Sequence, residues 1–119
     1  MPTILIADDE PHMRRLIEMS LKKAGLDPVS IENGEVAVEL AEKILPAAIV
    51  LDVTMPVMDG LEALRRLKAN DSTREIPVVM LTSKGFELTR NEAEISGAAA
   101  FITKPFSPRI LAESIKELV

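Results

Sequence analysis

The sequence AAIVLDVTMPVMDG occupies residues 47–60 and gives the clearest structural signal in the chain. Its first part, Ala47 to Leu51, is a short apolar run typical of a strand that is buried on both faces. Asp52 follows the run directly, and Asp59 can then cap a helix whose Glu62 reaches back in a capping-box arrangement. The stretch therefore predicts a strand, an acidic loop and a helix in succession, which is one βα unit.

The same unit repeats along the chain in both directions. Other runs rich in aliphatic and β-branched residues predict strands at Thr3 to Ala7, Ile76 to Leu81 and Ala99 to Thr103, with a weaker one at Asp27 to Ile31. Between the strands, apolar residues recur at helical spacing, in the sets Leu16, Ile17, Leu21 and Ala24; Ala37, Leu40, Ala41 and Ile44; Leu61, Leu64 and Leu67; and Ile110, Leu111, Ile115 and Leu118. Strands that alternate with helices imply parallel pairing, because a parallel neighbour is reached only by a long return connection.

Turn and cap residues mark where these helices begin and end. Gly25 is placed to end the first helix, Pro46 closes the second, and Ser107-Pro108 opens the last. Residues 86–96 predict a further helix, loosely held because polar residues interrupt its apolar face. The chain is predicted to belong to the α/β class, with five βα units in a single domain over residues 1–119.

Composition narrows the classes of function. The 119 residues are 47% apolar, which is enough for one core, and 14 Lys and Arg against 19 Asp and Glu give a net charge of −5. This acidity argues against unaided binding to nucleic acid or an anionic membrane. The longest apolar stretch, Pro46 to Leu51, is too short to span a bilayer, and no secretory signal is visible, so a cytoplasmic protein is expected.

Polar residues follow one predicted strand after another, at the edge where the carboxyl ends of parallel strands meet. They are Asp8 and Asp9, Asp52, Thr82 and Lys104. Ligands bind at this edge in open parallel sheets. Three neighbouring carboxylates would repel one another unless a cation lies among them, and Mg²⁺ prefers such oxygen ligands.

The alternative readings of single residues are weaker than the combined one. Asp8 and Asp9 alone suggest a solvated cap, Thr82 a strand end, and Lys104 a surface lysine. Together with Asp52 they supply what phosphoryl transfer requires: a carboxylate nucleophile beside a metal, a cation and a hydroxyl donor. A zinc or copper site is disfavoured, because there is no cysteine and the single histidine, His12, is expected at the surface.

Four blocks resemble the receiver domain of bacterial response regulators: LIADDE at 5–10, LDVTMPVMDG at 51–60, LTSKG at 81–85 and TKPF at 103–106. The resemblance covers essentially the whole chain. It implies a flavodoxin-like (βα)5 three-layer sandwich with the parallel strand order 2-1-3-4-5, the order that is generally illustrated with a receiver protein.

The resemblance also implies a metal site and a phosphate acceptor. Asp8 and Asp9 would hold Mg²⁺, with Asp9 the more direct ligand, and Asp52 would coordinate the metal and accept the phosphoryl group. Thr54 would add its backbone carbonyl to the metal shell. The phosphoryl group would come from a sensor histidine kinase or a phosphotransfer protein.

A switch is implied at the last two strands. Lys104 would pair with the phosphate, and the Lys104-Pro105 bond would be cis. Thr82 would move toward the new oxygens and Phe101 would turn into the space this opens. A downstream protein would read the changed face, which residues 86–96, the last strand and the last helix would form.

Departures from the family pattern concern the output and not the chemistry. Many relatives carry two acidic residues where this chain has Ala99-Ala100, and DNA-binding relatives often carry arginine in place of Ser114. Without these charges, the salt-bridged dimer of that subfamily is not expected, so we predict a monomer or a weak dimer. Phe101 replaces the commoner tyrosine and lacks its hydroxyl.

Three other functions fit the sequence less well. A haloacid dehalogenase-like phosphohydrolase would need a second aspartate at the position of Thr54. A nucleotide-binding fold would need a glycine-rich phosphate loop after a strand, and the sequence contains none. A degenerate receiver acting only as a scaffold is expected to have lost part of the site, and here all five residues are present.

Overall fold

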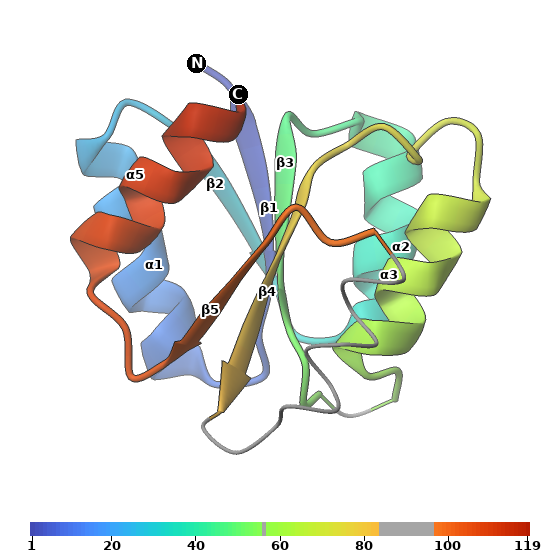
Figure 1. Ribbon diagram of the computed structural model, residues 1–119, viewed down its shortest axis with the longest axis horizontal. Helices are drawn as coiled ribbons and strands as arrows, with labels where there is room; N and C mark the ends of the chain where they lie inside the picture. Colours follow the sequence, from blue (N-terminus) through green and yellow to red (C-terminus); the bar gives the residue numbers. More distant parts are fainter. Residues whose placement is uncertain (56, 84–96) are drawn as a thin grey trace.

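The computed structural model describes residues 1–55, 57–83 and 97–119. All five strands are parallel and form one sheet in the order β2-β1-β3-β4-β5, which confirms the predicted topology (Figure 1). The strands are β1 (Thr3–Ala7), β2 (Asp27–Ile31), β3 (Ala48–Asp52), β4 (Val78–Ser83) and β5 (Ala100–Lys104).

Three strands begin later than predicted. The first two match the expected boundaries, whereas β3 and β5 begin one residue later and β4 begins two residues later. For β4 the cause is Pro77, which has no N–H to donate to the ladder and contributes only its carbonyl, to the Ile49 N–H at 3.0 Å.

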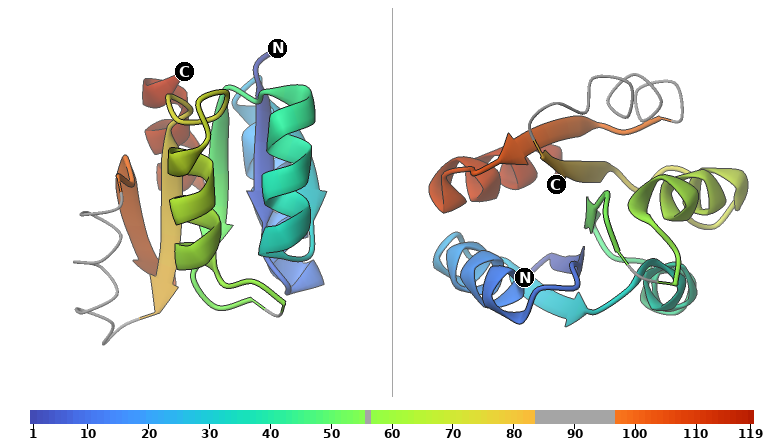
Figure 2. Two further views of the ribbon diagram at one scale, coloured as in Figure 1. Left: turned by 90° about the vertical axis from the view of Figure 1, so that its right-hand side faces the viewer. Right: turned by 90° about the horizontal axis from the view of Figure 1, so that it is seen from below.

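In the part of the chain that the structure describes, four helices cover the sheet: α1 (Pro11–Lys23) and α5 (Pro108–Leu118) on one face, α2 (Gly34–Ile44) and α3 (Gly60–Ala69) on the other (Figure 2). This is the expected three-layer arrangement. The further helix predicted at residues 86–96 lies outside the described residues. Within the described ranges, no helix combines the length and apolarity that crossing a membrane requires.

Helix ends follow the predicted signals with one variation. Asp59 and Ser107 cap α3 and α5 by accepting from main-chain N–H groups, and Gly25 follows α1 with a φ of +82°. The Glu62 carboxylate, predicted to reach back to Asp59 in a capping box, instead pairs with Arg66 at 3.0 Å. At the end of α2 the left-handed residue is Leu45, just before Pro46, where glycine is usual.

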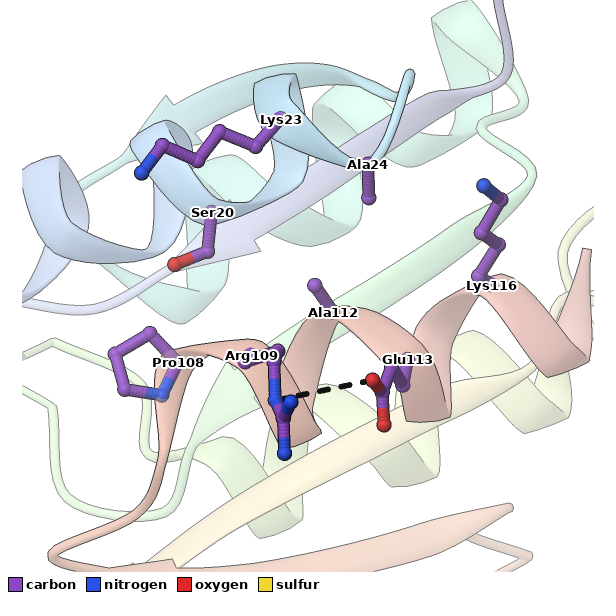
Figure 3. A pocket seen from close by; sticks show the side chains of 8 residues that line it. All are labelled: Ser20, Lys23, Ala24, Pro108, Arg109, Ala112, Glu113 and Lys116. Carbon is purple, nitrogen blue, oxygen red and sulfur yellow. Dashed lines mark ion pairs between the residues drawn. The ribbon is translucent and has the colours of Figure 1, made fainter.

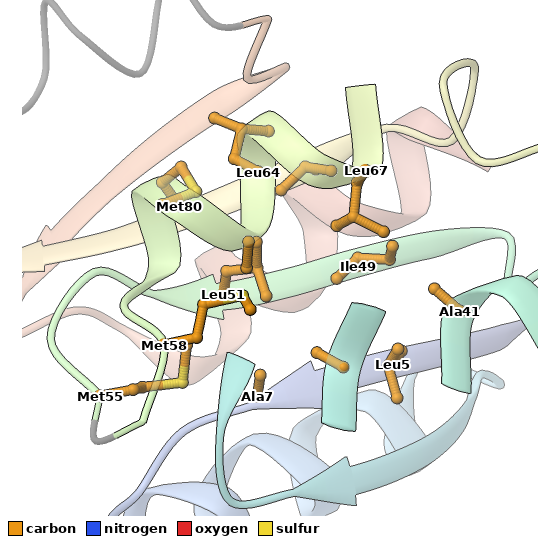
Figure 4. Packing of buried hydrophobic residues seen from close by; sticks show 13 residues of the cluster. Leu5, Ala7, Ala41, Ile49, Leu51, Met55, Met58, Leu64, Leu67 and Met80 are labelled. Carbon is orange, nitrogen blue, oxygen red and sulfur yellow. The ribbon is translucent and has the colours of Figure 1, made fainter. Parts of the chain in front are cut away.

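Side-chain alternation along the strands divides the core into two clusters. One cluster packs between the sheet and α2 and α3, and includes Leu5, Ile49 and Met80 (Figure 4). The other packs against α1 and α5 and includes Ile4 and Val50. Strands buried on both faces explain the continuous apolar runs in the sequence.

Candidate functional site

Strand alternation places three predicted site residues on the same side of the sheet. Asp8 continues the alternation of Ile4 and Ile6 on β1, and Asp52 that of Ala48 and Val50 on β3, all four of which pack toward α1 and α5. Lys104 continues the alternation of Ile102 on β5 in the same way. The three side chains therefore converge from three strands at one edge.

Lys104 joins the two buried carboxylates. Its Nζ lies 3.1 Å from Asp52 Oδ2 and 3.5 Å from Asp8 Oδ2. Asp8 is fully buried, Asp52 is 5% exposed, and the peptide bond between Lys104 and Pro105 is cis. One ammonium group thus serves two carboxylates that are largely shielded from water, an arrangement in which each charge depends strongly on its partners.

Burial and the neighbouring charges shift the pKa values of Asp8, Asp52 and Lys104. Burial is the main cause that raises the pKa of Asp8, whereas its bond from the Glu10 N–H and the charge of Lys104 act against the rise. Burial also raises the pKa of Asp52, and the neighbouring Asp8 adds to this effect. For Lys104, burial acts to lower the pKa, but attraction to Asp52 and Asp8 outweighs it and the pKa is raised.

The donor set fits a hard divalent cation. Ligand oxygens of Asp8, Asp9 and Glu10 lie within 4.8 Å of one another, and Asp9 and Glu10 are exposed. Lys104 connects Asp52 to this cluster through Asp8, and Arg14 binds the main chain of Asp8. Carboxylate oxygens, some of them open to water, are the ligands that Mg²⁺ uses in proteins.

The described residues between β3 and α3 are held by hydrogen bonds and by packing against the core. The Thr54 N–H donates to Asp52 Oδ1 at 3.3 Å, whereas the predicted role of the Thr54 carbonyl stays a prediction. Met55 and Met58 are buried in the core cluster beneath the loop (Figure 4). The Gly60 N–H donates to the Val53 carbonyl at 2.9 Å, so the loop closes back onto the end of its own strand.

Thr82 and Phe101, the predicted switch pair, lie on the opposite side of the sheet. Thr82 is 6% exposed and is paired in register with Thr103, while Phe101 is paired with Met80. Phe101 packs against the same cluster as Met80, and alternation along β4 turns Thr82 toward that side too. The two side chains therefore lie on one face of the sheet, on neighbouring strands, and are offset by two residues in the strand register.

The structure adds three residues to those predicted from the sequence. Glu10 joins the carboxylate cluster, Arg14 binds the main chain of Asp8, and Gly60 begins α3 against the main chain of Asp52. A signal for Arg14 was present, because the first turn of a helix that follows an acidic loop lies within reach of that loop.

A separate groove of about 500 Å³ runs between α1 and α5 (Figure 3). Its lining comprises Ser20, Lys23, Ala24, Pro108, Arg109, Ala112, Glu113 and Lys116. Arg109 and Glu113 form an exposed ion pair at 3.9 Å. None of the predicted site residues lines the groove.

Comparisons with known proteins agree with the observed fold. Residues 4–116 match the family described as response regulator receiver domain. The transcriptional regulatory protein SrrA of Staphylococcus aureus is 41% identical over 116 residues, which cover 98% of this chain and 47% of SrrA. The chain therefore spans about half the length of this curated relative.

Solved structures with the same fold include two that bear on the site. A response regulator described as putative from Chloroflexus aurantiacus has a TM-score of 0.93 and 31% identity, with 98% of this chain and 96% of that chain covered. The receiver domain of the sensor histidine kinase PA1611 from Pseudomonas aeruginosa, with a magnesium ion in its active site cleft, has a TM-score of 0.90, 28% identity and coverage of 98% and 96%. From the family match and the fold together, this chain belongs to the response regulator receiver domains.

Proposed function

We propose that Asp52 accepts a phosphoryl group in a magnesium-dependent reaction and that the chain acts as a switch in a phosphorelay. The observation that carries this proposal is the bridge from Lys104 Nζ to Asp52 Oδ2 and Asp8 Oδ2. It holds the acceptor carboxylate beside a second carboxylate and a cation, at the edge of the sheet where ligands bind.

In the proposed reaction, an Asp52 carboxylate oxygen attacks phosphorus and the bond between phosphorus and the donor breaks. The bonding electrons leave with the donor atom, which is a nitrogen if the donor is a phosphorylated histidine, and that imidazole then takes up a proton. Mg²⁺, held by Asp8, Asp9, Asp52 and the Thr54 carbonyl, would neutralise charge on the transferring oxygens. Lys104 would move from the free carboxylate to the new phosphoryl oxygens.

The response to phosphorylation is proposed to begin at Thr82. Its hydroxyl would hydrogen-bond to a phosphoryl oxygen, and Phe101, on the same face of the sheet, would change its packing in the space released. This changes the face that β5 and α5 present to a downstream protein. We further propose a cytoplasmic signalling module whose receiver domain spans residues 1–119 and promotes its own phosphorylation and dephosphorylation.

The partners follow from the same chemistry. The donor would be a histidine kinase or phosphotransfer protein, and the target a protein, because the net charge of −5 opposes direct binding to nucleic acid. Ala99, Ala100 and Ser114 offer no charges for the dimer of the acidic and arginine-bearing relatives. A monomer or weak dimer is proposed.

Intact-mass measurement after incubation with acetyl phosphate and Mg²⁺ tests the acceptor. One added phosphoryl group is expected, and Asp52→Asn should abolish it. Asp59→Asn is the matched control, since it makes the same chemical change in the same loop at an exposed cap where asparagine also caps well. Unchanged labelling of Asp52→Asn would refute the assignment, and steady turnover of external phosphate esters would favour the phosphohydrolase.

The switch has its own test. The chain has three phenylalanines and no tyrosine or tryptophan, so the NMR signals of the Phe101 ring can be followed with little overlap. Phosphorylation should shift them strongly, and Thr82→Ala should retain labelling while reducing the shift. Equal shifts in Thr82→Ala and the unmodified chain would separate Thr82 from the switch.

A further inference from the structure

The turn that carries the metal-binding carboxylates is held by a side chain outside the acidic cluster. Arg14 Nη1 donates to the Asp8 carbonyl oxygen at 2.7 Å, six residues back along the chain. We propose that Arg14 is a positioning residue, which fixes the connection from β1 to α1 so that Asp8 and Asp9 present their carboxylates to the cation. This inference rests on the proposed function.

Arg14 makes hydrogen bonds to both ends of that connection. Its main-chain N–H donates to the Glu10 carbonyl at 3.0 Å, while its guanidinium reaches the Asp8 carbonyl. Within and beside the turn, the Asp8 N–H donates to the Ile31 carbonyl at 3.2 Å and the Glu10 N–H donates to Asp8 Oδ1 at 2.9 Å. Hydrogen bonds therefore hold Asp8 and Glu10, the first and last residues of the turn.

Within the turn itself, the side-chain hydrogen bond is the one from the Glu10 N–H to Asp8 Oδ1. At the N-terminus of α1, the Glu10 side chain makes no cap hydrogen bond, and Pro11 has no N–H to offer. The guanidinium adds a donor to the Asp8 carbonyl from one helical turn further along the chain. Arg14 is half-buried and lies along a hollow that Ser30 and Ile31 of β2 also line, which limits the directions it can take.

The choice of a carbonyl acceptor separates Arg14 from Lys104. Lys104 contacts carboxylate oxygens directly, the Oδ2 atoms of Asp8 and Asp52. Arg14 binds a main-chain oxygen and leaves the carboxylates open to a metal ion. A planar guanidinium with several donors suits such a fixed contact better than a flexible ammonium group.

The sign of one measurement distinguishes positioning from simple charge. Arg14 is a cation near a cation site, so Coulomb repulsion alone predicts that removing its charge tightens Mg²⁺ binding. Positioning predicts the opposite. Partners that orient metal ligands typically contribute about 10- to 100-fold in affinity, and we expect Arg14→Met to weaken Mg²⁺ binding by about 10-fold.

The experiment measures Mg²⁺ affinity by isothermal titration calorimetry, without a phosphate donor. Arg14→Met keeps most of the apolar stem, Arg14→Lys should recover part of the affinity, and Arg15→Met is the matched control at the exposed neighbouring position. In labelling with acetyl phosphate, the Arg14→Met defect should shrink as Mg²⁺ approaches saturation. Arg15→Met should stay within about twofold of the unmodified chain, because its charge is screened by solvent.

Unchanged or tighter Mg²⁺ binding by Arg14→Met would overturn the inference, as would equal losses in Arg14→Met and Arg15→Met. If Arg14→Met does not fold, the Mg²⁺ affinity of the less disruptive Arg14→Lys is measured in its place. A loss of affinity would then support the inference, and full affinity would refute it. Failure of the unmodified chain to bind Mg²⁺ or to accept phosphate would overturn the proposed function, and the inference with it. A chain that does both, with an unaffected Arg14→Met, would overturn the inference alone.

Discussion

Replacing Gly60 by alanine should displace the main chain of Asp52, the proposed acceptor. A Cβ at Gly60 would lie 2.3 Å from the Asp52 carbonyl oxygen, 2.9 Å from the Asp52 carbonyl carbon and 3.0 Å from Val53 Cα. All three are main-chain atoms, so no side chain can rotate to make room. The end of β3 or the start of α3 must move, and Asp52 moves with it.

The magnitude follows from three contributions. Overpacking in a well-packed region costs about 1–3 kcal/mol. Loss of the bond between the Gly60 N–H and the Val53 carbonyl, 2.9 Å long, costs about 1 kcal/mol, and the higher helix propensity of alanine returns up to about 1 kcal/mol. A net loss near 2 kcal/mol corresponds to a fall in Tm of about 8 °C for a domain of this size.

Gly25→Ala is the control. Gly25 has a φ of +82° with nothing within 4 Å of an added Cβ, so alanine there costs about 1–2 kcal/mol of backbone strain, far from the site. Thermal unfolding should show similar losses in both variants. Labelling by acetyl phosphate at a temperature where both are folded should fall about 10- to 100-fold in Gly60→Ala only. Normal stability and labelling of Gly60→Ala would refute the reasoning, and equal labelling defects would assign the effect to stability.

Three further variants test other parts of the structure. Without metal, Asp52→Asn should be more stable than the unmodified chain at neutral pH. The raised pKa of Asp52 gives the unmodified chain stability that is present in acid and lost as the pH rises. Urea unfolding at several pH values should therefore show that the difference in free energy of unfolding between the two proteins closes in acid. Mg²⁺ at about 100 times its Kd should stabilise the unmodified chain by about 2.7 kcal/mol and Asp52→Asn by less, and an equal gain would remove Asp52 from the metal site. Leu45→Gly should raise the free energy of unfolding by about 0.5–1 kcal/mol, since Leu45 is 55% exposed with a φ of +45°; a loss would mean that its contacts outweigh the strain. Lys68→Met should lower the free energy of unfolding by about 2 kcal/mol, because Lys68 Nζ donates to the Arg74 carbonyl at 3.0 Å and the Ile76 carbonyl at 2.8 Å; an unchanged urea midpoint would contradict this.

Local pattern was sufficient where each residue's neighbours in the chain determine its structure. The apolar runs and the caps at Asp59 and Ser107 are readable because strand burial and helix capping act over a few residues. Strand limits were less readable, since pairing with another strand sets them, as the later start of β4 after Pro77 shows. The roles of Thr82 and Phe101 stay predictions.

By itself the sequence determined the βα alternation, the acidic balance and the types of side chain that follow each strand, because these depend on composition and short-range order. Only the tertiary structure decided which atoms meet. Lys104 reaches Asp8 across 96 residues and Asp52 across 52, and the register of four strands sets those distances. Arg14 binds the main-chain oxygen of Asp8, and Gly60 lies against the main chain of Asp52, because the folded turns bring these groups together. Residue type alone does not specify such contacts.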